Sequence, residues 1–399
     1  MTTLHISNRA DLLAALKSAQ GGETFILADG DYGALSISTR FADTLRIVSE
    51  TPGGAVFSTV ALHGAENLAL DGITTTSWIK AERGASQIEI SNSQIGDAAY
   101  FKDASGITLH NNDIAAGTYG IVLNSISGFT ITGNTVQGAR EDLLRITGDS
   151  HDGLIEGNML RDVIATKGTH PDLIQLIGLN GVSPHDIIIR GNLLYDDTTT
   201  GETVAQGIFM SDPKGAGYYN ILIEDNLIRT NSPNTIYING GEENVVIRNN
   251  TLMPGDGDGG AFIRLASKGA FGNSGVTVED NVAKILLDES KDATIGDNYI
   301  YGRGADLSLL FQGSSGSEWA DYLPVPGSPI DISSGYGAGA WLADFLAEAA
   351  IATFRSAPDD SFGPMPDQAA FTDPLGLAWD NPVENTVHLP SLYEGDTLV

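Results

Sequence analysis

The stretch IIIRGNLL (187–194) is followed further along the chain by ILIEDNLI (221–228). Both share one pattern, in which an apolar segment leads to a bend that ends in Asn. Apolar residues alternate before the bend, Gly or Asp precedes the Asn, and two apolar residues follow it. Alternation with a period of two indicates a β-strand. Gly-Asn and Asp-Asn tolerate the left-handed backbone of a tight bend. The stretch therefore predicts a strand, a bend at Asn and another strand.

Copies of this pattern recur along most of the chain. The residue before the Asn is Gly, Asp or Asn in every copy, and successive Asn residues are 17 to 34 residues apart. The repeated residues are Asn112, Asn134, Asn158, Asn192, Asn226, Asn250, Asn281 and Asn298.

A strand-rich repeat of this length is typical of a solenoid, in which each coil stacks on the one before it. Asn side chains at the same bend of successive coils can exchange amide hydrogen bonds. We therefore predict an all-β fold, a right-handed parallel β-helix solenoid, with an N-terminal capping helix and a mixed C-terminal cap. The alternative is a β-sandwich whose turns happen to contain Asn.

With these repeats the chain resembles the pectin-lyase-like superfamily of right-handed β-helix proteins, over roughly residues 20–302. The start SNRADLLAALKSAQ (7–20) predicts an N-capped amphipathic helix at about residues 8–19. This order looks like the helix that plugs the N-terminal end of polysaccharide lyases of this fold. A plug is expected, because an open coil would expose apolar core and strand edges.

The repeat stops after residue 302, so we divide the chain into a β-helix with its N-terminal plug (1–302) and a C-terminal segment (303–399). AWLADFLAEAAIATFR (340–355) predicts an amphipathic helix within that segment. The segment is interpreted either as a cap of the solenoid or as an attachment or trimerisation segment, as in virion spikes. The resemblance implies a homotrimer for such spikes.

Composition narrows the classes of partner. The formal net charge is −30, which repels nucleic-acid phosphates, so we expect no nucleic-acid partner. There is no Cys, which excludes disulfides and thiolate metal sites. The first twenty residues lack a signal-peptide apolar region, and no run has the length of a membrane span. We expect no membrane insertion, and an extracellular or virion-surface location without a Sec signal peptide.

A second strand follows each repeat, and stacking these strands one coil per row predicts an outward-facing column. The fourth position of each strand faces outward, because the third and fifth are apolar. This column comprises Val122, Arg145, Gln175, Phe209, Tyr237 and Arg264. The first position gives Tyr119, Asp142, Asp172, Gln206, Asn234 and Ala261. An exposed ladder of aromatic and basic side chains suits a sugar chain.

Three chemistries fit the residues near this column. The candidate catalytic residues are Asp142, Arg145, Lys167, His170 and Asp172. In β-elimination on a uronic acid polymer, a basic side chain acts as base or neutraliser, and the two Asp residues hold Ca²⁺. In hydrolysis, the two Asp residues are the acid and the base. C5 epimerisation shares the first half of elimination.

The candidate substrate-binding residues are Gln175, Phe209, Lys214, Tyr237 and Arg264. The resemblance extends to phage tailspikes and to spikes of phage-like gene transfer agents, which recognise cell-surface polysaccharide. We therefore expect a spike-like protein that binds extracellular or cell-surface polysaccharide, with catalysis left open. The alternatives are a secreted polysaccharide lyase or C5-epimerase, and a non-catalytic adhesive or structural solenoid.

Overall fold

The structure is a computed structural model of the chain. It describes residues 2–165, 168–196, 204–211, 217–239, 242–266 and 272–355. Contacts divide the chain into two compact units, residues 1–348 and 349–399, and the architecture below concerns the first of them.

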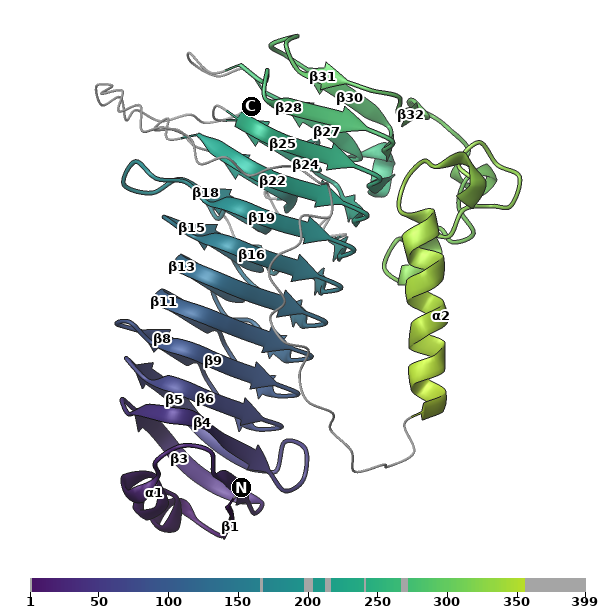
Figure 1. Ribbon diagram of the computed structural model, residues 1–399. Helices are drawn as coiled ribbons and strands as arrows, with labels where there is room; N and C mark the ends of the chain where they lie inside the picture. Colours follow the sequence, from purple (N-terminus) through teal and green to yellow (C-terminus); the bar gives the residue numbers. More distant parts are fainter. Residues whose placement is uncertain are drawn as a thin grey trace. The chain divides into compact units, whose positions relative to one another are not determined.

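The first unit is a stack of coils whose strands all pair in parallel, as the sequence predicts (Figure 1). The strands form three faces. Face A contains the later residues of β3 (Gly30–Ile37) and β5 (Ala55–His63), β8 (Ile79–Glu82), the first residues of β11 (Ala99–His110) and β13 (Ile121–Thr132), β15 (Leu144–Thr147), β18 (Asp172–Ile177), β21 (Gln206–Ser211), β24 (Ile236–Asn239), β27 (Phe262–Leu265) and β30 (Ile285–Asp288).

Face B contains β1 (Thr3–Ile6), β2 (Thr24–Leu27), β4 (Arg40–Ser49), β6 (Glu66–Asp71), β9 (Ser86–Ser91), the later residues of β11 and β13, β16 (His151–Glu156), β19 (His185–Arg190), β22 (Tyr218–Glu224), β25 (Glu242–Arg248), β28 (Val276–Glu279) and β31 (Thr294–Ile295).

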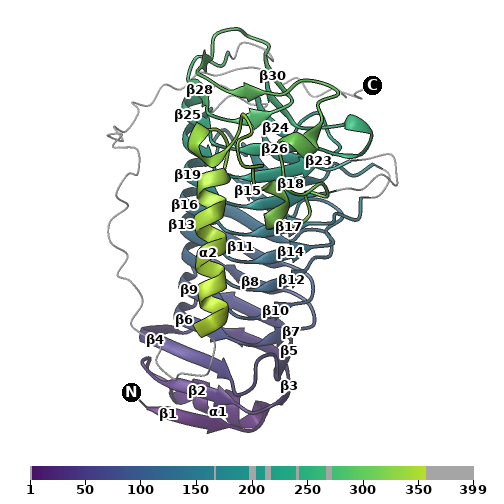
Figure 2. The same ribbon diagram turned by 90° about the vertical axis from the view of Figure 1, so that its right-hand side faces the viewer.

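Face C, seen in Figure 2, contains the first residues of β3 and β5, β7 (Thr74–Thr75), β10 (Gln94–Ile95), β12 (Asp113–Ala115), β14 (Thr135–Gln137), β17 (Met159–Arg161), β20 (Leu193–Tyr195), β23 (Leu227–Thr230), β26 (Thr251–Pro254), β29 (Val282–Ala283) and β32 (Tyr299–Ile300). Inward-pointing Ile, Leu, Val and Phe side chains of the three faces fill one continuous core.

The repeated Asn residues form the predicted ladder at the bend between faces B and C. From Asn112 to Asn281, each side-chain Nδ2 donates to the Oδ1 of the next Asn at 2.9–3.0 Å, and Asn298 accepts the last of these bonds. Each Oδ1 also accepts from the backbone N–H of the preceding ladder Asn. The residue before the Asn has positive φ from Asn111 to Asp280, which explains the choice of Gly, Asn and Asp there.

Helix α1 (Arg9–Ser18) confirms the predicted N-terminal helix. Asn8 is its N-cap and accepts a hydrogen bond from the backbone N–H of Asp11 at 3.1 Å. Leu12 is buried in the main core of the solenoid. The helix therefore places its apolar side against the first coils.

Residues 303–348 of the C-terminal segment belong to the first unit and pack against face C. The segment contains short 3₁₀ helices (Leu307–Leu309, Trp319–Tyr322 and Ile332–Ser334) and α2 (Gly339–Arg355), which confirms the helix predicted at 340–355. Phe311, Tyr322 and Leu342 form a second core with Leu193 and Leu227 of the face C strands. This part thus covers the flank of the coils. Attachment or trimerisation remains a prediction, and residues 356–399 lie outside the described residues. Among the described residues, no helix combines the length and apolarity needed to cross a membrane.

Gly191 shows how closely this cover fits. A Cβ added to Gly191 would lie 2.2 Å from Trp341 Cζ2, whereas one added to Gly157, at the same bend one coil earlier, meets nothing within 4 Å. Both glycines have positive φ. We expect Gly157→Ala to cost about 1–2 kcal/mol from backbone strain alone, and Gly191→Ala to cost about 1–3 kcal/mol more from overpacking. Denaturant unfolding of the pair measures the difference, and equal costs would contradict the packing of Trp341.

Candidate functional site

Face A aligns the predicted outward column in register. Strand pairing places Val122 beside Arg145, Arg145 beside Gln175, Gln175 beside Phe209, Phe209 beside Tyr237, and Tyr237 beside Arg264. These six residues, together with Tyr100 and Lys80 of the two preceding coils, are called the outer column from here on. Parallel in-register pairing stacks their side chains at the strand spacing of about 4.8 Å.

The expectation of an openly exposed ladder is wrong. Only 5% of Gln175 and 3% of Tyr237 are exposed, and Val122 is buried too, while Arg145, Phe209 and Arg264 are partly exposed. The side chains cover one another along the column. The rings of Phe209 and Tyr237 stack with centroids 4.7 Å apart and planes 11° apart, and the Arg264 guanidinium lies 5.6 Å from the Tyr237 ring.

Asp142 and Asp172 form a fully buried acidic pair beside the column. The backbone N–H of Asp172 donates to Asp142 Oδ1 at 3.0 Å, which couples the two coils directly. Arg145 Nε donates to Asp142 Oδ2 at 2.5 Å, and Arg145 Nη1 donates to the Tyr119 hydroxyl at 3.1 Å.

Two glutamines hold Asp172. Gln206 Nε2 donates to its Oδ1 at 2.9 Å, and Gln175 Nε2 donates to its Oδ2 at 2.6 Å. Because Gln175 uses its amide nitrogen in this way, its Oε1 is left without a hydrogen-bond partner among the described residues. A buried acceptor without a donor is costly, so this atom lowers the stability gained from packing Gln175 in the column.

Burial and mutual repulsion shift the protonation of the acidic pair. Desolvation, then the charge of Asp172, raises the pKa of Asp142 to about 7, although Arg145 opposes the shift. Desolvation also raises the pKa of Asp172, opposed first by the contact with His170. Two adjacent buried carboxylates, of which only Asp142 is paired with an arginine, favour keeping one proton on the pair near neutral pH.

His170 is the exposed titratable group of the site, with 61% of its side chain accessible. Its Nδ1 lies 3.7 Å from Asp172 Oδ2, and its Nε2 lies 2.9 Å from Gln206 Nε2. Its ring meets Phe209 edge-on, with centroids 5.5 Å apart. The contact with Asp172 raises the pKa of His170 despite partial burial. The site therefore places the exposed imidazole of His170 next to the buried carboxylate of Asp172.

Asp172→Asn tests these couplings. The substitution removes the charge that raises the pKa of His170, so that pKa should fall in an NMR titration, while the pKa of His185, which contacts Asp186 and Asp149, should not move. The free energy of unfolding offers a second readout. Unfolded Asp142 ionises near pH 4 and folded Asp142 near 7, so the folded state binds more protons between them and stability falls as pH rises.

In the Asp172→Asn variant this fall should be smaller, because Asp142 no longer faces a second carboxylate. An unchanged His170 titration, or an unchanged slope of stability between about pH 4 and 7, would contradict the assigned couplings.

The pair does not fit the predicted Ca²⁺ site. Carboxylate oxygens are suitable ligands for Ca²⁺, but all four oxygens of Asp142 and Asp172 already accept hydrogen bonds from nitrogen donors. The Arg145 guanidinium also occupies the position of a cation beside Asp142. Within the described parts of the chain, no group of three or more His, Asp or Glu side chains is placed to hold a metal ion.

The structure thus brings together Asp142, Arg145, His170, Asp172 and Gln175, with Phe209, Tyr237 and Arg264 following in the next coils. Arg264 also donates to Glu289 at 2.7 Å. Lys167 and Lys214, predicted as a catalytic and a binding residue, lie outside the described residues.

Sequence reasoning missed the lower part of the outer column. Lys80 pairs with Tyr100, and Tyr100 pairs with Val122, so the column continues three coils below Arg145. Lys80 Nζ lies 4.3 Å from the Trp78 ring and 5.8 Å from the Tyr100 ring. The signal was available, because WIKAE (78–82) and AYFKD (99–103) alternate in the same way as the aligned strands.

Residues 78–252 match the family model described as the right handed β-helix region, which confirms the predicted right-handed parallel β-helix. A search of curated proteins gives no match. Among solved structures, the Dettilon tailspike protein (gp208) is 15% identical, with a TM-score of 0.48, over 75% of this chain and 63% of the tailspike. The chain thus spans less than two thirds of that tailspike.

Two polysaccharide-modifying enzymes are also among the similar solved structures. The A-module of the Azotobacter vinelandii mannuronan C-5 epimerase AlgE4 is 12% identical, with a TM-score of 0.40, over 75% of this chain and 99% of the module. An alginate lyase from Paenibacillus sp. str. FPU-7 is 13% identical, with a TM-score of 0.35, over 74% of this chain and 98% of the lyase.

Proposed function

We propose that this β-helix binds polysaccharide along the outer column of face A, from Lys80 to Arg264. One observation carries the proposal: a single register column holds the aromatic residues Tyr100, Phe209 and Tyr237, Lys80 and Arg264 flank them in the same column, and the Trp78 ring lies beside Lys80. Aromatic rings pack against the apolar faces of sugar rings. Arginine and lysine donate to hydroxyl and carboxylate oxygens.

The charges of the column favour an acidic glycan. Arg145, Arg264 and Lys80 are partly exposed cations on a chain whose net charge is −30. Arg145 pairs with Asp142 and Arg264 with Glu289 through Nε, so an acidic ligand would contact their remaining guanidinium N–H groups. The chain as a whole repels a polyanion, but at contact distance the local basic groups dominate the electrostatic interaction with the ligand. Binding of an acidic polymer should therefore weaken when salt screens these contacts, and the aromatic contribution should remain.

The biological role that we propose is recognition of cell-surface or extracellular polysaccharide by a spike-like protein, extracellular or on a virion surface. The segment from residue 303 would then serve attachment, with a homotrimer as the assembly. The alternatives are a secreted lyase or C5-epimerase, and an adhesive or structural solenoid. The predominance of aromatic and basic groups in one column favours a glycan-binding role over a purely structural one.

If the site is catalytic, its geometry favours proton transfer at His170. Elimination and epimerisation at C5 of a uronic acid both begin with a base that removes the C5 proton. His170 is exposed, and Asp172 contacts it from the buried side. Arg145 lies in the coil next to Asp172 and could neutralise the carboxylate of a bound uronic acid. Hydrolysis by Asp142 and Asp172 is less favoured, because both carboxylates are fully buried and engaged.

A panel of alginate, pectate, capsular and O-antigen polysaccharides tests the proposal, with Ca²⁺ and with EDTA. Affinity electrophoresis reports binding, absorbance reports unsaturated uronates, and a reducing-end assay reports hydrolysis. NMR of the recovered polymer reports epimerisation. Binding of at least one polysaccharide is expected with or without EDTA, and products, if formed, should disappear in His170→Ala. Failure to bind any member would overturn the proposal, and loss of binding in EDTA would restore the Ca²⁺ prediction.

A further inference from the structure

We propose a second saccharide site, in a pocket at the corner between faces A and B, that takes a sugar residue without a carboxylate. The pocket has a volume of about 370 Å³, within the range of small-molecule pockets. Its polar lining comprises Asp103, Ser105, Ser125, Ser127, Asp149 and His151. The proposal extends the function above, since it adds a second contact for the same class of ligand.

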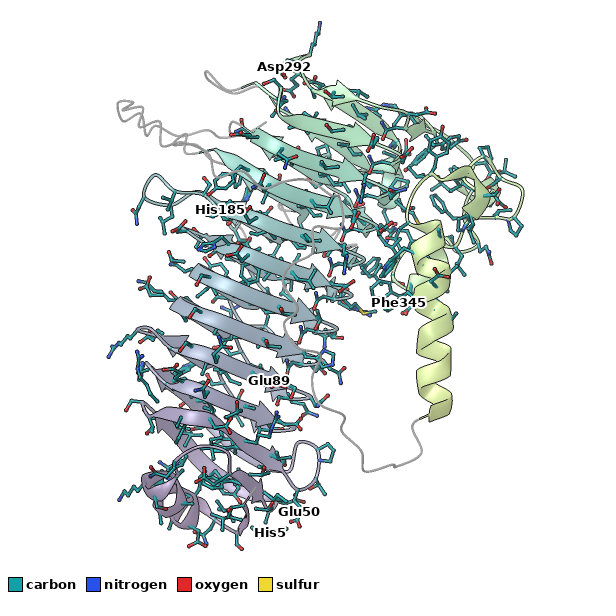
Figure 3. The ribbon with its side chains drawn as sticks, viewed as in Figure 1. His5, Glu50, Glu89, His185, Asp292 and Phe345 are labelled. Atoms are coloured by element: carbon teal, nitrogen blue, oxygen red, sulfur yellow. The ribbon has the colours of Figure 1, made fainter. Side chains whose placement is uncertain are left out.

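The pocket exists because a stack of rings ends abruptly on face B. Strand pairing places Ser105 beside Ser127, Ser127 beside His151, and His151 beside His185. His151 and His185, the latter labelled in Figure 3, stack with centroids 4.8 Å apart and planes 3° apart. Tyr219 continues the stack at 4.3 Å from His185. One face of the His151 ring is thus covered by His185, and its other face lies toward the small side chain of Ser127.

Hydrogen bonds fix the ring that forms this wall. His151 Nδ1 donates to Asp152 Oδ2 at 2.8 Å, and His185 Nε2 donates to Asp149 Oδ1 at 3.2 Å. Nδ1 of His151 is engaged with Asp152, and His151 Nε2 has no hydrogen-bond partner among the described residues. The pocket therefore offers a flat ring held in place, with an imidazole nitrogen still available to a ligand.

The remaining lining selects the ligand by charge. Asp103 and Asp149 are exposed carboxylates, which accept hydrogen bonds from sugar hydroxyls and repel a uronate. The hydroxyls of Ser105 and Ser127 can donate or accept. A platform with carboxylates and hydroxyls around it is suited to a neutral sugar ring. This is the opposite of the outer column, where Arg145 and Arg264 favour acidic sugars.

The two sites are close enough for one polymer. Asp149 follows Arg145 by four residues in the same coil, so their Cα atoms are at most about 14 Å apart. A glycan that alternates acidic and neutral residues can therefore contact both. Such a polymer would be distinguished from a homopolymer of uronic acid by the pocket, and not by the outer column.

Ser127→Tyr is the sharpest test, because it continues the existing ring stack into the pocket and fills it. Ser86→Tyr is its matched control, since Ser86 lies in the same register position beside Ser105 but does not line the pocket. Cellotetraose, N-acetylchitotetraose and mannuronate tetrasaccharide are the probes, measured by ligand-observed NMR and calorimetry on the full chain. Thermal unfolding and circular dichroism confirm that each variant is folded.

We expect a neutral tetrasaccharide to bind wild type and Ser86→Tyr equally, and to bind Ser127→Tyr and His151→Ala at least about tenfold more weakly. Mannuronate binding should be unchanged by Ser127→Tyr and weakened by Phe209→Leu. Neutral binding that survives Ser127→Tyr, or no neutral binding up to about 10 mM, would overturn the pocket site. Neutral binding lost in Ser127→Tyr, with no effect of Phe209→Leu on any probe, would keep the pocket and overturn the outer column.

Discussion

Asn192→Ala should lower the free energy of unfolding by about 3–5 kcal/mol, because it breaks the ladder at a fully buried position. The Asn192 Oδ1 accepts from both the backbone N–H and Nδ2 of Asn158, and its Nδ2 donates to Asn226 Oδ1 at 2.9 Å. Its Nδ2 also donates to the carbonyl oxygens of Ile155 and Arg190. Alanine would leave several of these groups buried without partners. Denaturant unfolding followed by circular dichroism measures the loss.

Asn298→Ala is the matched control at the end of the ladder. Asn298 accepts from Asn281 in the same way, but it is only partly buried, so water can replace its bonds. We expect a cost of about 1 kcal/mol. Equal losses of unfolding free energy at the two positions would show that burial does not determine how much the Asn ladder contributes to stability.

Phe209→Leu should weaken polysaccharide binding about 10- to 100-fold while leaving the fold intact. Leucine keeps apolar volume against the neighbouring coils, but it removes the ring that stacks on Tyr237 and meets His170 edge-on. The loss should appear for the polysaccharide selected by the panel, measured by calorimetry or affinity electrophoresis.

Tyr336→Leu controls for the general effect of removing a partly exposed ring. Tyr336 lies near Tyr299, with centroids 6.1 Å apart, and belongs to the C-terminal segment rather than to the outer column. Its substitution should leave affinity unchanged. Equal losses in the two variants would mean that the effect on binding comes from stability, and unchanged affinity in Phe209→Leu would remove Phe209 from the binding face.

The fold and the register of face A could be predicted from sequence, because both follow from local rules. Alternation identifies strands, and a Gly, Asn or Asp before each ladder Asn marks the bend. Once strands such as DLIQL (172–176) and QGIFM (206–210) are aligned, the pairing of Gln175 with Phe209 follows, and the structure has this pairing.

Exposure could not be predicted in the same way. Alternation indicates which way Gln175 and Tyr237 point, but their burial depends on how neighbouring side chains pack over them. The hydrogen bonds that engage both Asp142 and Asp172 depend on side-chain positions across three coils, and no spacing in the sequence encodes them. The pocket beside His151 was missed for a related reason, since it arises from a small residue, Ser127, under the end of a ring stack.

Hydroxyl-radical footprinting of the chain with and without the bound polysaccharide tests the central claim most directly. Radicals label accessible aromatic side chains, and Trp78, Tyr100 and Phe209 are all partly exposed on face A, as is Tyr336 in the C-terminal segment. We expect the polysaccharide to lower the labelling of Trp78, Tyr100 and Phe209 and to leave the labelling of Tyr336 unchanged. Protection of Tyr336 with unchanged labelling of the three face A residues would place the glycan elsewhere and contradict the account.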